Sequence, residues 1–326
     1  MTRVKLHTFQ ISLSICLIIL MILNLLGGIK WYSLPHIWTT TSPGFAIIWQ
    51  IRFPRMIAAV LVGAMLAVAG QILQTVSRNP IADPSLLGIN SGANLALIIG
   101  TIVGLPFTIY WRFGLAIIGA LITFIFVMAL SMGKGGMNPT RLILSGTVFS
   151  GFLNGIAYGF SILTHSSQRF RNFLVGGFSG TTLPQIGLLM GIFLLVLLFI
   201  FWLRQDITML ALDEKISQSL GNQLVVTRIF AVCVVVLATA ISVAIGGNIA
   251  FIGLGIPHLV RFFDHRDFKH TFIENMLLGG AFLSFCDFLS KTLTAPYELP
   301  LGACSAALGG LFLIWYVRKD RRVAFS

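Results

Sequence analysis

Two arginines precede a long apolar run in the stretch WQIRFPRMIAAVLVGAML at residues 49–66. Arg52 and Arg55 lie three residues apart, on either side of Phe53 and Pro54. A guanidinium is a planar fork of hydrogen-bond donors that suits a carboxylate, so an exposed pair would fit an acidic partner. An arginine at the end of a membrane helix also reaches back to lipid headgroups. The residues alone leave both interpretations open.

Acidic side chains are scarce, with 10 among 326 residues. Asp287 alone lies well inside an apolar run, and Lys291 follows it four residues later. One turn of helix places these two side chains on the same face, so we expect Lys291 to neutralise Asp287. A proton-coupled carrier normally needs several carboxylates or histidines within the membrane, and a single one is thin support for that class.

The motifs of common catalytic sites are absent from the sequence. GKGG at 133–136 lacks the spacing and the hydroxyl residue of a phosphate-binding loop, so we do not expect this chain to bind ATP. No HExxH, no pair of histidines four apart and no GxSxG occurs. The 4 cysteines lie in apolar segments without CxxC spacing, which is typical of core residues. We therefore expect neither an enzyme nor a bound metal or cofactor.

The composition is that of a membrane protein. Hydrophobic residues make up 56% of the chain, charged residues only 10%, and the mean hydropathy is +0.93. So few charges cannot solvate the surface of a globule of this size, and this predicts a polytopic α-helical fold. The net charge is +12, but the basic residues do not form one stripe. They lie between the apolar runs, as expected where loops contact anionic lipid and follow the positive-inside bias. A nucleic-acid partner is therefore not expected.

Ten apolar segments approach the length of about 20 residues that a membrane-spanning helix needs. The first has a basic start but no small-residue cleavage site, so we expect a retained span rather than a signal peptide. The eighth is short and contains Pro257, which predicts a broken or partly inserted helix. The expected spans are 9–29, 53–76, 86–105, 113–132, 142–163, 184–203, 228–246, 249–263, 273–290 and 301–317.

The distribution of lysine and arginine predicts the orientation. With a cytoplasmic N-terminus, 15 of the 22 basic residues fall in inside segments and 7 in outside segments, so we expect both termini inside. Residues 1–326 then form a single transmembrane domain in the cell membrane. Arg52 and Arg55 lie at the outer mouth of the second span, against the inside bias.

A faint internal repeat is visible. RNPIADPSLLGIN at 78–90 and GNIAFIGLGIPH at 247–258 share Asn, Ile-Ala and Leu-Gly-Ile in order. The spans before them run in opposite directions, as an inverted repeat of the second to fifth spans against the seventh to tenth requires.

The longest cytoplasmic connection is 204–223. Its apolar residues recur at helical spacing between polar ones, which predicts a short amphipathic helix. Such a helix fits either a groove on a partner protein or the lipid interface, and the residues leave both open. The apolar positions are Met209, Leu212, Ile216 and Leu220.

Four stretches together resemble the FecCD family, the permease subunits of type II ABC importers for ferric siderophores, haem and vitamin B12. The most specific are the first, IRFPRMIAAVLVGAMLAVAGQILQTVSRNPIADPSLLGINSGA at 51–93, and the third, GNIAFIGLGIPHLVR at 247–261. The others are LALDEKISQSLG at 210–221 and FCDFLSKTLTAPYELPLGACSAALGG at 285–310. They occur in family order and cover nearly the whole chain.

The resemblance implies roles for particular residues. Arg52, Arg55 and Lys291 match outward-facing basic positions that dock a substrate-binding protein through its carboxylates, although the family usually has arginine at the position of Lys291. Asn79 and Ile81 match the cytoplasmic gate of the translocation path. The alternative interpretation is a turn without a gating role, because Asn-Pro is a common turn dipeptide. The coupling helix that enters the ATPase matches Leu210, Leu212, Asp213, Ile216, Leu220 and Gly221, with Asp213 standing where glycine is usual.

The resemblance also implies a function. We expect a permease subunit of an ATP-driven importer, most simply for ferric siderophore, with haem or cobalamin as alternative cargoes. Its expected partners are a second permease subunit, two ATPase subunits that hold ATP and magnesium, an extracytoplasmic binding protein and the lipid bilayer. An ion-coupled secondary transporter is the competing class.

Overall fold

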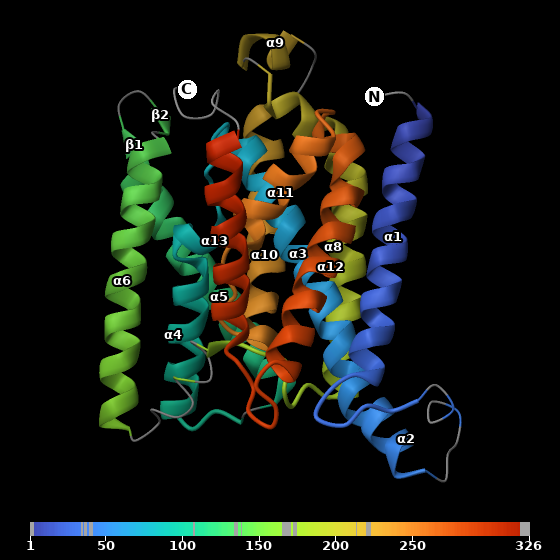
Figure 1. The fold of residues 1–326 in the computed structure, drawn as a ribbon. Helices are drawn as coiled ribbons and strands as arrows, with labels where there is room; N and C mark the ends of the chain where they lie inside the picture. The colour runs from blue at the N-terminus through green and yellow to red at the C-terminus, as the bar shows by residue number, and fades with distance from the viewer. Residues whose placement is uncertain are drawn as a thin grey trace.

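Among the described residues, ten helices of 12 residues or more form a bundle, and most of them run from one end of the molecule to the other (Figure 1). The computed structural model describes residues 3–33, 35, 38, 42–106, 108–133, 136–137, 139–164, 171, 175–212, 214–219 and 223–319. The long helices are α1 Arg3–Leu26, α3 Phe53–Ser77, α4 Ile89–Ile102, α5 Ile109–Ser131, α6 Pro139–Leu163, α8 Leu183–Leu210, α10 Leu224–Gly246, α11 Ile252–Phe263, α12 Phe268–Thr292 and α13 Leu301–Lys319. Each corresponds to one of the ten predicted spans, so the all-α polytopic fold is confirmed.

Short elements connect these helices. Helix α2, Pro43–Ile47, begins at Ser42, whose hydroxyl accepts the amide N–H of Phe45, and a π-helical turn, Ile48–Arg52, joins it to α3. A 3₁₀ turn, Pro84–Leu87, precedes α4, and α9, Glu214–Ser219, follows α8. Two-residue strands, β1 Met132–Gly133 and β2 Gly136–Met137, form an antiparallel pair between α5 and α6.

The two ends of the bundle differ in the elements they carry. Helix α1 begins and α13 ends at the same end, which also holds α9 and the β1–β2 pair (Figure 1). This is the end to which the lysine and arginine distribution assigns the cytoplasm, and we call it the inner end. Helix α2 projects from the opposite, outer end.

Two of the ten helices are too short to cross a bilayer by themselves. At about 1.5 Å per residue, α4 with 14 residues and α11 with 12 extend roughly 21 and 18 Å, against a hydrocarbon core of about 30 Å. Seven of the described helices are long and apolar enough to span, and the tenth, α13, has a shorter apolar part, Leu301–Trp315. The expected third span at 86–105 is thus too long. The eighth span is short, as expected, but α11 continues through Pro257 without a break. Helix α4 lies toward the outer end and α11 toward the inner end (Figure 1).

One matched pair of segments, α3 with α4 and α10 with α11, agrees with the inverted repeat that the sequence predicted. Helices α3 and α10 run in opposite directions, and each is followed by a connection that leads into a half-length helix (Figure 1). A residue with positive φ stands at the start of both half-helices, Gly88 before α4 and Phe251 before α11. The sequence similarity between 78–90 and 247–258 agrees with the structure only in part. Asn79 and Asn248 both follow the end of a helix, but Gly88 precedes α4 whereas the matching Gly255 lies inside α11.

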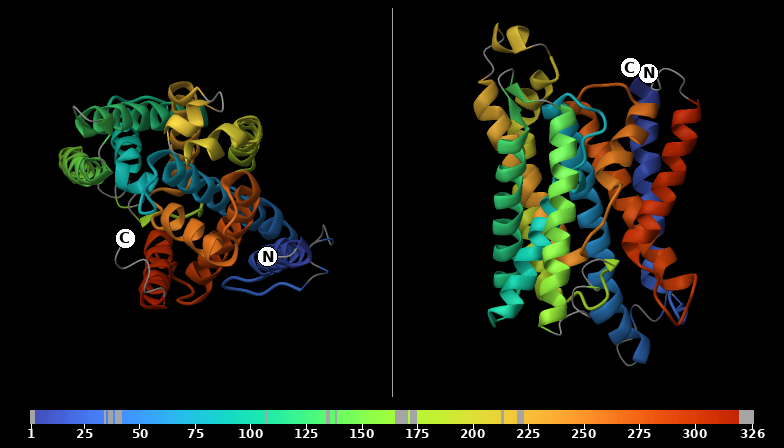
Figure 2. Two further views of the ribbon diagram at one scale, coloured as in Figure 1. Left: turned by 90° about the horizontal axis from the view of Figure 1, so that it is seen from above. Right: turned by 90° about the vertical axis from the view of Figure 1, so that its left-hand side faces the viewer.

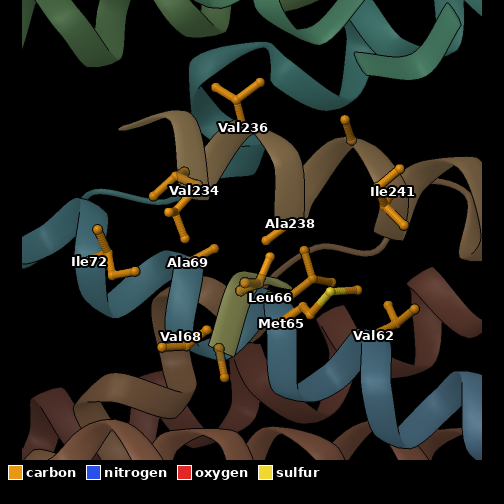
Figure 3. Close-up of a cluster of buried hydrophobic side chains, with 14 of the residues drawn as sticks. Val62, Met65, Leu66, Val68, Ala69, Ile72, Val234, Val236, Ala238 and Ile241 are labelled. Carbon is orange, nitrogen blue, oxygen red and sulfur yellow. The ribbon is translucent and has the colours of Figure 1, made fainter. Parts of the chain in front are cut away.

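Helix α3 forms the centre of the bundle. It packs against α8, α10, α11 and α12, whereas α1, α6 and α13 lie at the periphery in the end-on view (Figure 2). Apolar side chains of α3 and α10 interdigitate along this contact (Figure 3). The buried residues there include Val62, Met65, Leu66, Val68, Ala69, Ile72, Val234, Val236, Ala238 and Ile241.

Glycines allow the backbones around α3 to touch. A Cβ on Gly63 would lie 2.3 Å from the carbonyl oxygen of Gly279 in α12, and a Cβ on Gly70 would lie 1.9 Å from that of Gly253 in α11. Both distances are far below van der Waals contact with rigid backbone. Small residues at helix crossings are how membrane helices gain close packing.

Replacing Gly70 with alanine is therefore expected to destabilise the protein. The added methyl group forces α3 and α11 apart, at a cost of about 1–3 kcal/mol or more. Gly187→Ala in α8 is the matched control, since nothing lies within 4 Å of its Cβ position. The midpoints of denaturation in detergent measure both, and equal midpoints for the two variants would contradict this packing.

Candidate functional site

Five charged side chains converge at the outer end, and we call them the outer charge cluster. Arg52 ends the π-helical turn and Arg55 lies in the first turn of α3, while Asp287 and Lys291 lie near the end of α12. Glu298 comes from the connection between α12 and α13. The structure thus brings together all three basic residues that the sequence assigned to docking, and Lys291 lies within electrostatic range of the other four.

Arg55 is the centre of this cluster. Its Nε donates to Asp287 Oδ1 at 2.9 Å, and its Nη1 donates to Glu298 Oε1 at 2.5 Å. Asp287 is completely buried, and Arg55 is 7% exposed. The direct ion-pair partner of Asp287 is Arg55, 232 residues away in sequence. Lys291, the expected partner, interacts with Asp287 by charge but donates its hydrogen bond elsewhere.

Arg52 and Lys291 are bound to backbone rather than to carboxylates. Arg52 Nη1 donates to the carbonyl oxygens of Leu25 and Leu26 at the end of α1, and Nη2 donates to that of Lys30. Lys291 Nζ donates to the carbonyl oxygen of Asn24 at 2.6 Å. A cation at the C-terminus of a helix satisfies carbonyl groups that lack intrahelical partners. Both side chains therefore attach α1 to the centre of the bundle.

Exposure distinguishes the members of the cluster. Arg52 and Lys291 are 9% and 7% exposed, while the side chain of Glu298 is 44% exposed. Sequence reasoning missed Glu298, although it is the sole acidic residue in the segments expected outside. The signal that could have identified Glu298 is that a single carboxylate among several basic residues at the outer end is expected to form an ion pair.

The proposed gate residues lie at the inner end, directly after α3. Arg78 ends α3 in the left-handed conformation, and the amide N–H of Asn79 donates to Gln74 O at 3.1 Å. The side-chain oxygen of Asn79 accepts the N–H of Ile81 at 3.0 Å, which forms a tight turn around Pro80. Ile81 is 56% exposed. The structure confirms a turn here, and the gate role stays a prediction.

The coupling segment also lies at the inner end, where α9 projects beyond the bundle (Figure 1). Leu212 is 42% exposed and Ile216 is 54% exposed, so both present apolar surface. Leu210 is instead fully buried, so its side chain belongs to the core. The remaining coupling residues, Asp213, Leu220 and Gly221, lie outside the described residues.

Polar contacts join the two halves of the repeat in the interior. Asn90 Nδ2 donates to Asn248 Oδ1 at 2.9 Å, which links α4 to the connection after α10. Gln74 Nε2 donates to Gly253 O at 3.3 Å, and its Oε1 accepts from Arg261 Nη2 at 3.3 Å. These contacts hold α3 and α11 in register where their backbones touch.

A second charged group lies at the inner end of α12. Arg266 donates to Asp264 and Glu274, and Gln10 of α1 donates to Glu274. Glu274 is fully buried, so α12 holds a second buried carboxylate besides Asp287. The sequence predicts a span that starts at 273, which places Glu274 at its end, whereas α12 begins at Phe268. Burial raises the pKa of Asp264, but the hydrogen bonds from Arg266 outweigh it and hold the pKa below its usual range. The Asp264–Arg266 pair therefore stabilises the folded protein at neutral pH, and this contribution is lost as the pH falls through the lowered pKa of Asp264.

Among the described residues, no three His, Cys, Asp or Glu side chains are grouped closely enough to hold a metal ion. The arrangement is one for transport: α3 and α10 run in opposite directions, each is followed by a half-length helix, and a short helix projects from the inner end. Inverted repeats with discontinuous helices define a class of membrane transport proteins.

Comparison with known proteins identifies the family. The model of the FecCD transport family matches residues 16–319, so the chain belongs to this family of multi-pass cell-membrane permeases of ABC importers. It is 34% identical over 316 residues to the vitamin B12 import system permease protein BtuC of Escherichia coli O9:H4 (strain HS), covering 96% of this chain and 95% of that one. It is 33% identical over 300 residues to the iron(3+)-hydroxamate import system permease protein FhuB of Bacillus subtilis (strain 168), covering 90% and 76%.

A solved structure agrees. A metal-chelate type ABC transporter in an inward-facing conformation superposes with a TM-score of 0.84 at 26% identity, covering 96% of this chain and 99% of that chain. The chain is thus a permease of an importer whose relatives carry metal chelates, siderophores or vitamin B12.

Proposed function

We propose that this chain is one membrane half of an ATP-driven importer for ferric siderophore. The observation that carries the proposal is α9, which projects from the inner end with Ile216 exposed, in a chain that belongs to the FecCD family. No bond of the cargo is made or broken. ATP binding and hydrolysis in separate ATPase subunits bias the helix packing between outward-open and inward-open arrangements. The chain itself binds no cofactor, and ATP with magnesium resides in the ATPase.

A second permease subunit, identical or paralogous, completes the path in this proposal. Gly151, Gly155 and Gly159 lie four residues apart on α6, are exposed, and have nothing within 4 Å of their Cβ positions. Rows of small residues at this spacing allow a neighbouring membrane helix to approach closely. Helix α6 at the periphery therefore supplies a face that fits a partner helix.

Two ATPases would receive the coupling segment at the inner end, one on each permease. Leu212 and Ile216 supply exposed apolar surface there, and helix-in-groove contact is the recognition mode that such surface fits. The lipid interface is the alternative location for α9, and the variant described in the Discussion distinguishes the two.

The substrate-binding protein would dock at the outer end through the outer charge cluster. Arg52, Arg55 and Lys291 are the proposed contacts, and all three have internal partners in the free chain. The exposed Glu298 occupies Arg55 Nη1, so a carboxylate of the binding protein would take the place of Glu298. Glu298 would then compete with docking.

Glu298→Gln is accordingly expected to strengthen the affinity for the binding protein by about fivefold at low salt, since an exposed ion pair contributes up to about 1 kcal/mol. The gain should vanish at high salt, where exposed charges are screened. Binding to purified permease complex in lipid nanodiscs measures it, with Glu298→Asp as the charge-preserving control. An affinity that does not change at low salt would contradict the competition.

The proposal is tested through the ATPase. The complex of this chain with its ATPase is reconstituted in liposomes, and the binding protein is added loaded with an iron(3+)-hydroxamate, haem or cobalamin. We expect the loaded binding protein to raise ATP hydrolysis, most with the iron complex. A larger rise with haem or cobalamin would replace the cargo, and no rise with any of them would refute the importer.

A further inference from the structure

Arg78 spans the gap between the gate turn and the segment that leads into α9. Its Nε donates to the carbonyl oxygen of Leu210 at 3.0 Å, and its Nη2 donates to the carbonyl oxygen of Leu212. Leu210 is the last residue of α8, and Leu212 lies two residues before the start of α9. A single side chain therefore holds the backbone on both sides of the C-terminal cap of α8, Ala211.

The backbone of Arg78 is in a conformation that glycine normally provides. Its φ is 48° and ψ is 33°, one of two positive φ values outside glycine among the described residues. Helices commonly end on a left-handed glycine, which carries no steric penalty there. Arginine in this position has a conformational cost of order 1 kcal/mol, so its side chain must contribute something that glycine lacks. The two hydrogen bonds to the end of α8 are that contribution.

The other side of Arg78 is attached firmly to the gate turn. Its own N–H donates to Thr75 O at 3.3 Å, and the next residue, Asn79, donates to Gln74 O and accepts from Ile81 N–H. Gln74 also bonds to Gly253 and Arg261 of α11. The backbone of Arg78 therefore belongs to the same hydrogen-bonded turn as the exposed Ile81, and Gln74, which accepts from this turn, also bonds to the half-helix α11.

Space for movement exists beside this contact. An open pocket of about 280 Å³ is lined by Gln74, Thr75, Arg78, Pro80, Ala211 and Arg261. A shift at the end of α8 can thus displace the gate turn without compressing packed side chains. Interfaces that transmit conformational change have discrete alternative arrangements, for which such room is needed.

We propose that Arg78 is a positioning residue that transmits movement of the α8–α9 junction to the Asn79–Ile81 turn, and so couples the nucleotide state of the ATPase to the inner opening of the path. The inference rests on the proposed function, because it takes α9 as the ATPase contact. It adds the side chain through which that contact reaches the gate. A purely structural alternative is that Arg78 caps α8 and holds it in place.

The test measures how the gate turn responds to nucleotide. Ile81→Cys is introduced with alanine in place of Cys16, Cys233 and Cys304, while the buried Cys286 is kept. The complex with its ATPase is placed in nanodiscs, and the rate of modification by a polar maleimide is measured with and without a magnesium complex of a slowly hydrolysed ATP analogue. The same measurement is made with Arg78→Ala, with Arg78→Lys and with the control Lys269→Ala, which removes an exposed cation at the same end.

With Arg78 present, the nucleotide should change the rate at which the introduced thiol is modified. Arg78→Ala should reduce this nucleotide-dependent ratio by roughly threefold to thirtyfold while ATPase association and basal hydrolysis persist. Arg78→Lys should restore part of the response, and Lys269→Ala should leave it intact. A full response in Arg78→Ala, or loss of ATPase association in that variant, would overturn the proposal in favour of a structural cap. If the chain with Arg78 intact binds no ATPase, it is the proposed function that fails.

Discussion

Replacing Asp287 with alanine is expected to destabilise the protein by about 3–5 kcal/mol, because it leaves the guanidinium of Arg55 buried without its ion-pair partner. Asp287 is fully buried and Arg55 is 7% exposed, so water cannot replace the lost contact. Glu298 is too exposed to compensate, since an exposed pair contributes at most about 1 kcal/mol. Denaturation of the purified protein in mixed micelles measures the loss.

A double variant separates the charge from the packing. Arg55→Met with Asp287→Leu removes both charges and keeps apolar volume, so it should recover most of the stability that Asp287→Ala loses. Lys291→Met should cost less than Asp287→Ala, because it removes one bond to a carbonyl oxygen and leaves the Arg55–Asp287 pair intact. If Lys291→Met were the more damaging change, Lys291 would be the essential partner of Asp287.

Replacing Ile216 with aspartate is expected to weaken association with the ATPase by about thirtyfold or more and to abolish transport with it. Apolar anchors that become buried in a partner groove are typically worth about 2 kcal/mol or more. Ile216 is 54% exposed in the free chain and lies on the projecting α9, so the charge should not disturb folding. Copurification of the ATPase with the permease and uptake into proteoliposomes measure the two effects.

Ser219→Asp provides the matched control, because it adds the same charge to an exposed position of the same short helix. It should leave association within about threefold, as expected for a substitution outside the buried anchors. If Ile216→Asp associates with the ATPase as well as Ser219→Asp does, then α9 lies in the lipid interface instead of a protein groove.

The long helices and their directions could be predicted because hydrophobic length and lysine distribution act locally. The half-length of α4 could not, because the apolar run of 86–105 continues through residues that form the 3₁₀ turn and the left-handed Gly88. In the interior of a membrane protein an irregular connection needs no polar composition when neighbouring helices satisfy its backbone. Hydropathy alone therefore overstates such helices.

The charged sites show a different limit of sequence reasoning. The topology placed Arg52, Arg55 and Lys291 at the outer face and the family resemblance grouped them, and the structure shows them close together there. The partners of these residues could not be predicted. Arg55 and Asp287 are far apart in sequence, and Arg52 binds backbone carbonyl oxygens, which every residue has. Helical spacing predicted Lys291 as the partner of Asp287, but tertiary packing places the guanidinium of Arg55 next to Asp287 instead. The link from Arg78 to Leu210 was hidden for the same reason.

The central claim is that this chain forms the path of an importer driven by ATP. The most direct measurement is uptake of a radioactive iron(3+)-hydroxamate by liposomes that hold the chain with its ATPase, with the loaded binding protein on the outer face. Our account predicts uptake that requires magnesium and ATP on the side of the ATPase and is indifferent to an imposed proton or sodium gradient. Uptake without ATP that follows such a gradient and is lost in Asp287→Asn would contradict it and identify an ion-coupled carrier.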